Sequence, residues 1–82
     1  MKGYIRMMPE RKSFAFISAE NGESVFVHRD DYRDNWLQLT QDFYQHKDSK
    51  IEVKFDLVES EKGPRAENCR RITHKVDIIS DN

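Results

Sequence analysis

The sequence predicts an all-β fold of five short antiparallel strands that form a small barrel or a sandwich. Two observations support this prediction. Short runs rich in β-branched and aromatic residues are separated by turn-forming residues along most of the chain. No stretch shows an amphipathic helix pattern of full length. Because barrel closure alone removes the exposed edges of so few strands, we expect a closed barrel.

Composition limits the size of the core and the kind of partner. The 82 residues make one small domain, expected over residues 1–73 with a C-terminal tail at 74–82, and a charged fraction of 35% predicts a thin core. The formal charge of −1 means that any contact with nucleic acid needs a local basic patch. Cys69 has no second cysteine to pair with, and no apolar run suits a signal peptide or a membrane span. We expect a cytoplasmic monomer that does not engage a membrane.

The first third of the chain predicts a three-stranded meander. Residues 3–8 mix Tyr, Ile and Met and are followed by a proline, which favours a strand over a helix, and residues 9–12 are typical of a turn. Residues 13–18 and 25–28 predict the second and third strands from their aromatic and branched side chains. The Asn21-Gly22 pair between them tolerates the positive φ of a tight hairpin.

Residues 29–50 predict a long loop with one or two helical turns. Asp30 is well placed to cap a short turn. The apolar residues beyond it have the spacing of a broken helix without a complete amphipathic stripe: Trp36, Leu37, Leu39, Phe43 and Tyr44. A connection of this length in so small a domain is usually functional.

The last two predicted strands differ in pattern, because apolar and charged residues alternate strictly in the first and not in the second. Residues 51–57 alternate strictly between apolar and charged side chains, as in a half-buried strand, and Glu-Lys-Gly-Pro at residues 61–64 predicts a turn. Residues 65–73 predict a fifth strand in which Ala66 and Cys69 are the inward residues but have opposite parity. We therefore expect a β-bulge between them.

The second and third strands each have two usable faces, since successive side chains of a strand point to opposite sides. One face carries small and aliphatic residues: Ala15, Ile17, Val25 and Val27. The other carries aromatic and imidazole rings beside Lys12: Phe14, Phe16, Phe26 and His28. The aliphatic face can fill a five-stranded barrel, so we expect the aromatic face to lie outward. The alternative, that these phenylalanines form the core, predicts that they are fully buried.

Three motifs in the expected order resemble those of the cold-shock domain, a five-stranded barrel of the oligonucleotide-binding (OB) fold. The sequence K-S-F-A-F-I at residues 12–17 is similar to the family's K-G-F-G-F-I, and V-F-V-H-R at residues 25–29 is similar to V-F-V-H-F. The sequence G-P-R-A-E-N at residues 63–68 is similar to G-P-x-A-x-N. The resemblance covers residues 3–72 and implies an antiparallel OB-fold barrel with a long loop between strands 3 and 4.

The resemblance implies binding of single-stranded RNA or DNA by stacking of bases on the exposed aromatic face, in an RNA-chaperone-like or regulatory role. Phe14, Phe16, Phe26 and His28 would form the stacking platform, and Trp36 would add a ring from the loop. Basic residues on either side would contact the nucleic-acid backbone. The full set implied for the interface is Arg6, Met7, Lys12, Phe14, Phe16, Phe26, His28, Arg29, Trp36, Lys62 and Arg65.

The chain also departs from the family pattern. Met7 and Met8 stand where the family has Trp and Phe, and Arg29 replaces a further aromatic residue. Base stacking is worth about 1 to 3 kcal/mol per base, so the loss of two rings predicts affinity lower by about a hundredfold unless Arg29 stacks or meets a phosphate. Met8 is expected in the core, whereas the place of Met7 stays open.

A second hypothesis is a protein-interaction or regulatory barrel that has lost most nucleic-acid affinity, with the aromatic residues of the long loop as its surface. An enzyme is not expected, because the carboxylates are scattered and no nucleophile–histidine grouping or glycine-rich phosphate loop is present. His46 and His74 lie at no recurrent ligand spacing, so no metal is expected, and no cofactor is implied.

Overall fold

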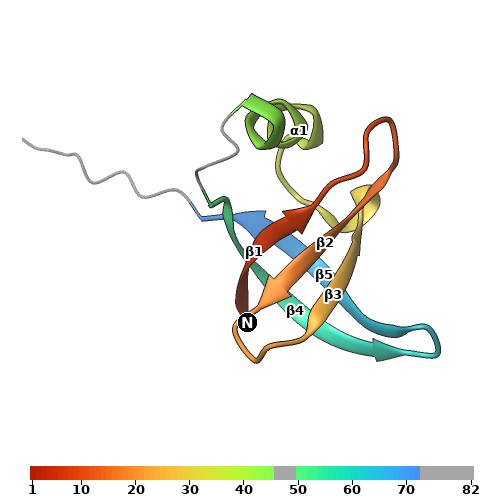
Figure 1. The fold of residues 1–82 in the computed structure, drawn as a ribbon. Coiled ribbons are helices and arrows are strands. Elements are labelled where there is room, and N and C mark those ends of the chain that lie inside the picture. Colours follow the sequence, from red (N-terminus) through yellow and green to blue (C-terminus); the bar gives the residue numbers. More distant parts are fainter. Residues whose placement is uncertain (46–49, 73–82) are drawn as a thin grey trace, which may run out of the picture.

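The computed structural model describes residues 1–45 and 50–72 and shows a closed five-stranded barrel with a helix at one end (Figure 1). Its order is β1-β2-β3-β5-β4, and β4 pairs back on β1. The predicted all-β barrel is confirmed, with one pairing, between β3 and β5, parallel instead of antiparallel. The expected domain boundary at residue 73 lies outside the described residues. The strands are β1 (Lys2–Met7), β2 (Phe14–Ala19), β3 (Ser24–His28), β4 (Glu52–Ser60) and β5 (Gly63–Arg71).

The turns between strands follow from local residue chemistry. Gly22 has a φ of 90°, and the side-chain oxygen of Asn21 accepts a hydrogen bond from the Glu23 amide at 3.0 Å, which confirms the predicted hairpin. The last turn is tighter than predicted. It consists of Glu61 and Lys62 alone, because Gly63, at a φ of 114°, already begins β5.

The β-bulge expected in the fifth strand is confirmed. Lys54 of β4 lies opposite Arg70, but Asp56, two residues later, lies opposite Glu67, so β5 carries one residue more than β4 between these pairs. Asn68 absorbs the distortion at a φ of 50°. The extra residue allows both Ala66 and Cys69 to point inward, and both are fully buried.

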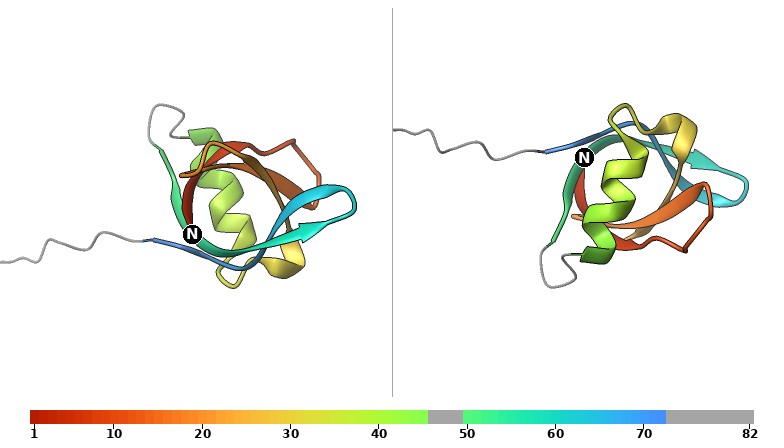
Figure 2. Two further views of the ribbon diagram at one scale, coloured as in Figure 1. Left: turned by 90° about the horizontal axis from the view of Figure 1, so that it is seen from below. Right: turned by 90° about the horizontal axis from the view of Figure 1, so that it is seen from above.

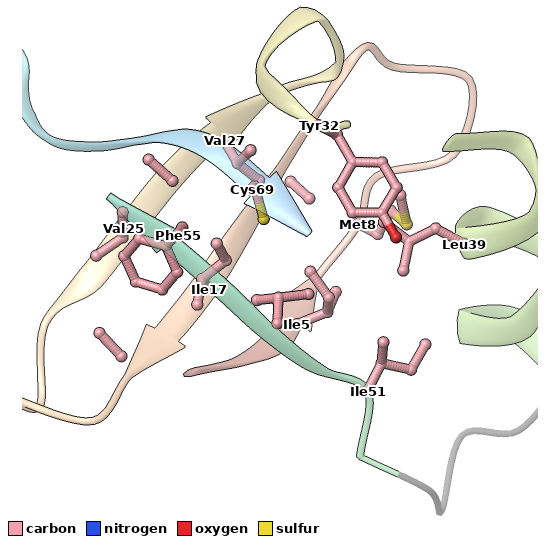
Figure 3. Close-up of a cluster of buried hydrophobic side chains, with 14 residues drawn as sticks. Ile5, Met8, Ile17, Val25, Val27, Tyr32, Leu39, Ile51, Phe55 and Cys69 are labelled. Carbon is pink, nitrogen blue, oxygen red and sulfur yellow. The ribbon is translucent and has the colours of Figure 1, made fainter. Parts of the chain in front are cut away.

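The barrel interior is filled by the aliphatic face of the strands (Figure 3). Met8 is buried in this core as predicted, with 2% of its surface exposed. Burial raises the pKa of the Cys69 thiol to about 12 and also raises the pKa of Tyr32, because both groups would lose solvation of the charged form. The fully buried side chains of largest volume are Phe55, Ile17, Leu39, Val25, Val27, Val53 and Cys69.

Gly3 marks a close approach between β1 and β2. A Cβ atom on Gly3 would lie 2.6 Å from Ile17 Cγ2 and 2.7 Å from the Ser18 carbonyl oxygen, and the second of these atoms belongs to the backbone. We therefore expect Gly3→Ala to lower the free energy of unfolding by about 1 to 3 kcal/mol, the usual cost of overpacking. Urea denaturation checks this, and an unchanged midpoint would contradict the close approach.

The segment predicted as a loop contains a regular helix, so the prediction of one or two helical turns was wrong in extent. Helix α1 (Trp36–Gln45) spans ten residues and follows a short 3₁₀ helix, η1 (Arg29–Asp31). Asn35 caps α1, since its side-chain oxygen accepts from the Gln38 amide at 3.0 Å. The turn at η1 exists as predicted, but His28 caps it in place of Asp30.

Helix α1 lies across one end of the barrel and covers the core there (Figure 2). Leu39 is 1% exposed, and Trp36 and Phe43, at positions three before and four after it, pack against the same cluster. The Arg71 guanidinium at the end of β5 forms an ion pair with Asp42 at 2.5 Å, and the Arg71 amide donates to Asp34 at 2.8 Å. These contacts fix the helix to the last strand.

Among the described residues, no helix has the length and apolar character needed to cross a membrane.

Candidate nucleic-acid interface

Three phenylalanines of β2 and β3 form a cluster on the outside of the barrel, which we call the aromatic triad: Phe14, Phe16 and Phe26. Phe16 lies directly opposite Phe26 in the strand register. The ring centroids of Phe14 and Phe26 are 5.5 Å apart in a stacked arrangement, and Phe16 meets each of the other rings edge-on at 5.9 and 5.8 Å.

The outward orientation predicted for these rings is confirmed. All three side chains are half-buried, whereas the neighbouring Ala15, Ile17, Val25 and Val27 are fully buried on the opposite face. The barrel core is therefore complete without the triad. A cluster of rings that the core does not need is available to a ligand.

His28 extends the triad at the end of β3. It lies opposite Phe14, and 40% of its side chain is exposed. Its Nδ1 atom accepts a hydrogen bond from the Asp30 amide at 3.0 Å, so in the neutral ring the proton is on Nε2. This bond fixes the plane of the imidazole beside the triad.

Arg6 and Met7 of β1 border the triad on one side. The guanidinium carbon of Arg6 is 5.9 Å from the centre of the Phe16 ring, and Arg6 also donates to the Ser24 hydroxyl at 2.8 Å. Met7 pairs with Phe16 and is 42% exposed, so it belongs to the surface. The sequence left open whether Met7 lies in the core or on the surface, and the structure places it on the surface.

Lys12 and Arg29 lie together at the far end of β2 and β3. Both are exposed, and the Arg29 amide donates to the Ser13 carbonyl at 2.7 Å, which brings Arg29 next to the residue that follows Lys12. In the pairing of β2 with β3, Phe14 lies opposite His28, so the two cations lie just beyond this last pair of residues.

A groove of about 710 Å³ runs between the triad and the turn that joins β4 to β5. Phe16 and Phe26 form one wall, and residues 60–65 form the other. The parallel pairing of Phe26 with Arg65 brings the two walls together. Lys62 and Arg65, predicted as basic groups beside the last turn, therefore lie next to the rings.

Arg65 is partly engaged within the protein. Its Nη2 atom forms an ion pair with Glu67 at 2.5 Å, while its Nε atom is buried and has no hydrogen-bond partner among the described residues. The guanidinium thus retains donor capacity at the edge of the groove.

Trp36 is the predicted interface residue that the structure does not bring to the triad. It begins α1, packs against the core and meets the Tyr32 ring edge-on at 5.7 Å. Its role in binding stays a prediction.

Tyr4 is an exposed ring that the sequence reasoning missed. It lies on the outward side of β1, two residues before Arg6, and is 40% exposed. The Lys50 ammonium is 5.1 Å from the centre of its ring. The sequence did contain a signal for Tyr4. Residues 4 and 6 of one strand share a face, so this spacing puts Tyr4 on the same side as Arg6.

Within residues 1–45 and 50–72, no group of three or more His, Cys, Asp or Glu side chains is placed to hold a metal ion. The two histidines considered for a metal site, His46 and His74, lie outside the described residues.

The arrangement of rings and cations suits planar, anionic ligands such as nucleotides.

Comparison with known proteins agrees with this geometry. Residues 1–72 match the family described as "'Cold-shock' DNA-binding domain". The chain is 34% identical over 72 residues to cold shock-like protein CspC of Bacillus cereus. The aligned residues cover 88% of this chain and 100% of the relative. It is 33% identical over 70 residues to cold shock protein CspD of Bacillus subtilis, covering 85% and 96% of the two chains. It is 31% identical over 71 residues to cold shock protein CspA of Staphylococcus haemolyticus, covering 87% and 97%.

Proposed function

The chain belongs to the cold-shock domain family, and from that membership and the exposed aromatic triad we propose that it binds single-stranded RNA or DNA by base stacking. The observation that carries the proposal is the cluster of three rings, with centroids less than 6 Å apart, on the outside of a barrel whose core is complete without them. Every base has a π-face, so such a platform accepts many sequences.

Basic residues support the same proposal by surrounding the rings. Arg6 lies on β1, Lys12 lies two residues before β2, and Arg29 lies directly after β3. Lys62 and Arg65 line the groove. Each can contact a phosphate without reading the base. Because these contacts are few and the chain carries a net charge of −1, we expect a shallow salt dependence.

An RNA-chaperone-like role follows from binding by mass action. A protein that binds single strands and not duplexes shifts the equilibrium of a structured RNA toward its open form. No energy source or catalytic group is needed for this effect. The extent of opening is set by the affinity for the single strand and by the protein concentration.

The exposed Met7 side chain marks the edge at which the platform is truncated. Met7→Trp is expected to raise the affinity for a pyrimidine-rich single strand by about tenfold or more, because a stacked ring contributes about 1 to 3 kcal/mol per base. Fluorescence anisotropy with a labelled oligonucleotide measures the change. Met7→Leu serves as the control, since it adds no ring. Equal affinities for the two variants would contradict a base-stacking role at this position.

A protein-interaction barrel remains the second candidate because α1 exposes two apolar side chains. Leu37 is 66% exposed and Tyr44 is 38% exposed. Trp36 and Phe43, which also suggested such a surface in the sequence, pack against the core instead. The apolar surface left on the helix is therefore smaller than expected.

Binding of matched probes separates the two candidates. A labelled pyrimidine-rich single strand, as DNA and as RNA, is titrated with the protein at low and at moderate salt, beside a duplex of the same sequence. We expect saturable binding of the single strands and much weaker binding of the duplex. A lack of saturable binding at low salt, with protein in the millimolar range, would favour the protein-interaction barrel.

A further inference from the structure

Three cations form a row across the side of the barrel made by β1, β4 and β5. Lys2 of β1 lies directly opposite Lys54 of β4, and Lys54 lies directly opposite Arg70 of β5. All three side chains are exposed. We call Lys2, Lys54 and Arg70 the cation row. Neighbouring strands are about 4.8 Å apart, so the row places three positive charges within about 10 Å at the backbone level.

The cation row is unfavourable for the isolated protein, because like charges directly opposite each other on neighbouring strands repel. None of the three cations takes part in an ion pair within residues 1–45 and 50–72. Three neighbouring cations that form no ion pair within the described residues are suited to an external anion.

No ion pair joins the cation row to an acidic residue in the part of the chain that the structure describes. Glu52 and Asp56 lie two residues on either side of Lys54 on the same face of β4. The Asp56 carboxylate accepts a hydrogen bond from the Asn68 amide group at 3.0 Å. Glu20 accepts a hydrogen bond from the backbone amide of Lys2, at 3.1 Å, and not from its ammonium group.

A shallow hollow of about 350 Å³ lies along the cation row. Lys54 and Arg70 line it together with Phe55, Asp56 and Asn68. The side-chain oxygen of Asn68 accepts from Arg33 at 3.1 Å, and its nitrogen donates one of its two hydrogens to Asp56. The positively charged donors that line the hollow are those of Lys54 and Arg70.

The outward face of β1 connects the cation row with the aromatic triad. Along this face lie Lys2, Tyr4 and Arg6, of which Arg6 contacts the Phe16 ring. The Lys50 ammonium lies over Tyr4. Rings and cations thus alternate over the five residues from Lys2 to Arg6, which span four steps along the strand, or about 13 Å. This alternation is typical of a surface that follows a single strand.

We propose that the cation row is a second phosphate-binding site, which holds the backbone of the same strand whose bases stack on the aromatic triad. The strand leaves the triad over Arg6, passes Tyr4 and reaches Lys2, Lys54 and Arg70. This proposal rests on the proposed function. It predicts that a nucleic-acid strand too long for the triad alone gains affinity. The added affinity comes from contacts with the cation row, on the other side of β1.

The test compares two oligothymidylates, one of about 6 and one of about 16 nucleotides, near the two ends of the range of OB-fold site sizes. The triple variant Lys2→Gln, Lys54→Gln, Arg70→Gln is expected to bind the short strand as the unmodified protein does. It is expected to bind the long strand on the order of 10- to 100-fold more weakly at low salt. The slope of log affinity against log salt for the long strand should also fall by about 2, or about 0.7 for each lost phosphate contact.

A charge-conserving variant provides the matched control. Lys2→Arg, Lys54→Arg, Arg70→Lys keeps the three cations and is expected to keep the affinity and salt slope for the long strand. The neutral variant is expected to melt at the same or a higher temperature at low salt, since it removes repulsion. Loss of binding through unfolding is thereby separated from loss of phosphate contacts.

Unchanged affinity and salt slope of the neutral variant for the long strand would overturn the proposal. Failure of the unmodified protein to bind the short strand would instead contradict base stacking on the triad. The two failures are distinguishable because they appear with different probes.

Discussion

The double variant Phe16→Ala, Phe26→Ala is expected to bind a pyrimidine-rich single strand about 2 to 6 kcal/mol more weakly, which is a loss of about 30-fold or more, since each stacked base contributes about 1 to 3 kcal/mol. Both rings face outward, lie 5.8 Å apart and line the groove beside the last turn. Their removal takes away the centre of the platform and one wall of the groove.

The same substitution is expected to cost less in stability than in binding. The two rings are half-buried on the outside of the barrel, and an aromatic pair contributes about 0.5 to 1.5 kcal/mol beyond the area it buries. Circular dichroism checks that the variant is folded at the temperature of the binding measurement. Isothermal titration calorimetry then measures its affinity.

Phe55→Leu provides the control for loss of a ring from the interior. Phe55 is 2% exposed in the core, so this change is expected to lower the midpoint of unfolding and leave affinity unchanged at temperatures where the protein is folded. An outcome in which the outward pair and the inward ring affect binding equally would contradict the assignment of the two faces.

The variant Leu39→Ala is expected to lower the free energy of unfolding by about 2 to 5 kcal/mol, the usual cost of removing a buried leucine. Leu39 is 1% exposed and extends from α1 toward Met8 and Tyr32 in the core (Figure 3). Leu39 is the buried residue of α1, and Trp36 and Phe43 pack against the same cluster beside it. Urea denaturation measures the loss.

Leu37→Ala is the matched control on the same helix. Leu37 is 66% exposed, so its truncation is expected to change stability by less than about 0.5 kcal/mol. Similar losses for the two leucines would show that α1 does not pack on the barrel through Leu39. A loss confined to Leu39 agrees with a helix that is part of the core.

The strands and their faces could be predicted because the signals are local. The period of two along residues 13–18 and 25–28 separates inward from outward side chains, and the structure has the same separation. The opposite parity of Ala66 and Cys69 was enough to predict the bulge in β5, because a strand can bury both only with an extra residue.

The length of helix α1 was underpredicted because apolar residues on its outer side obscure the inward-facing pattern. Trp36, Leu39 and Phe43 have helical spacing and pack inward, but Leu37 and Tyr44 add apolar residues on the outer side. The pattern then lacks a clean polar face. Asp30 was predicted to cap the short turn at η1, which His28 caps instead, and Asn35, which the prediction did not include, caps α1.

The groove and the cation row could not be predicted from local patterns. The groove depends on the parallel pairing of Phe26 with Arg65, and the cation row depends on the register of Lys2, Lys54 and Arg70. Both join residues that are far apart in the sequence. Such pairings are set by closure of the whole barrel, and no short segment encodes them.

A titration followed by backbone amide chemical shifts tests the central claim most directly. A pyrimidine-rich single strand is added to labelled protein at two salt concentrations. We predict that the shifts cluster on residues 12–17 and 25–29, which carry the aromatic triad and His28, and that they persist in part at the higher salt because stacking is less sensitive to screening than phosphate contacts. The absence of shifts in these two segments at low salt, at protein concentrations that detect weak binding, would contradict the claim.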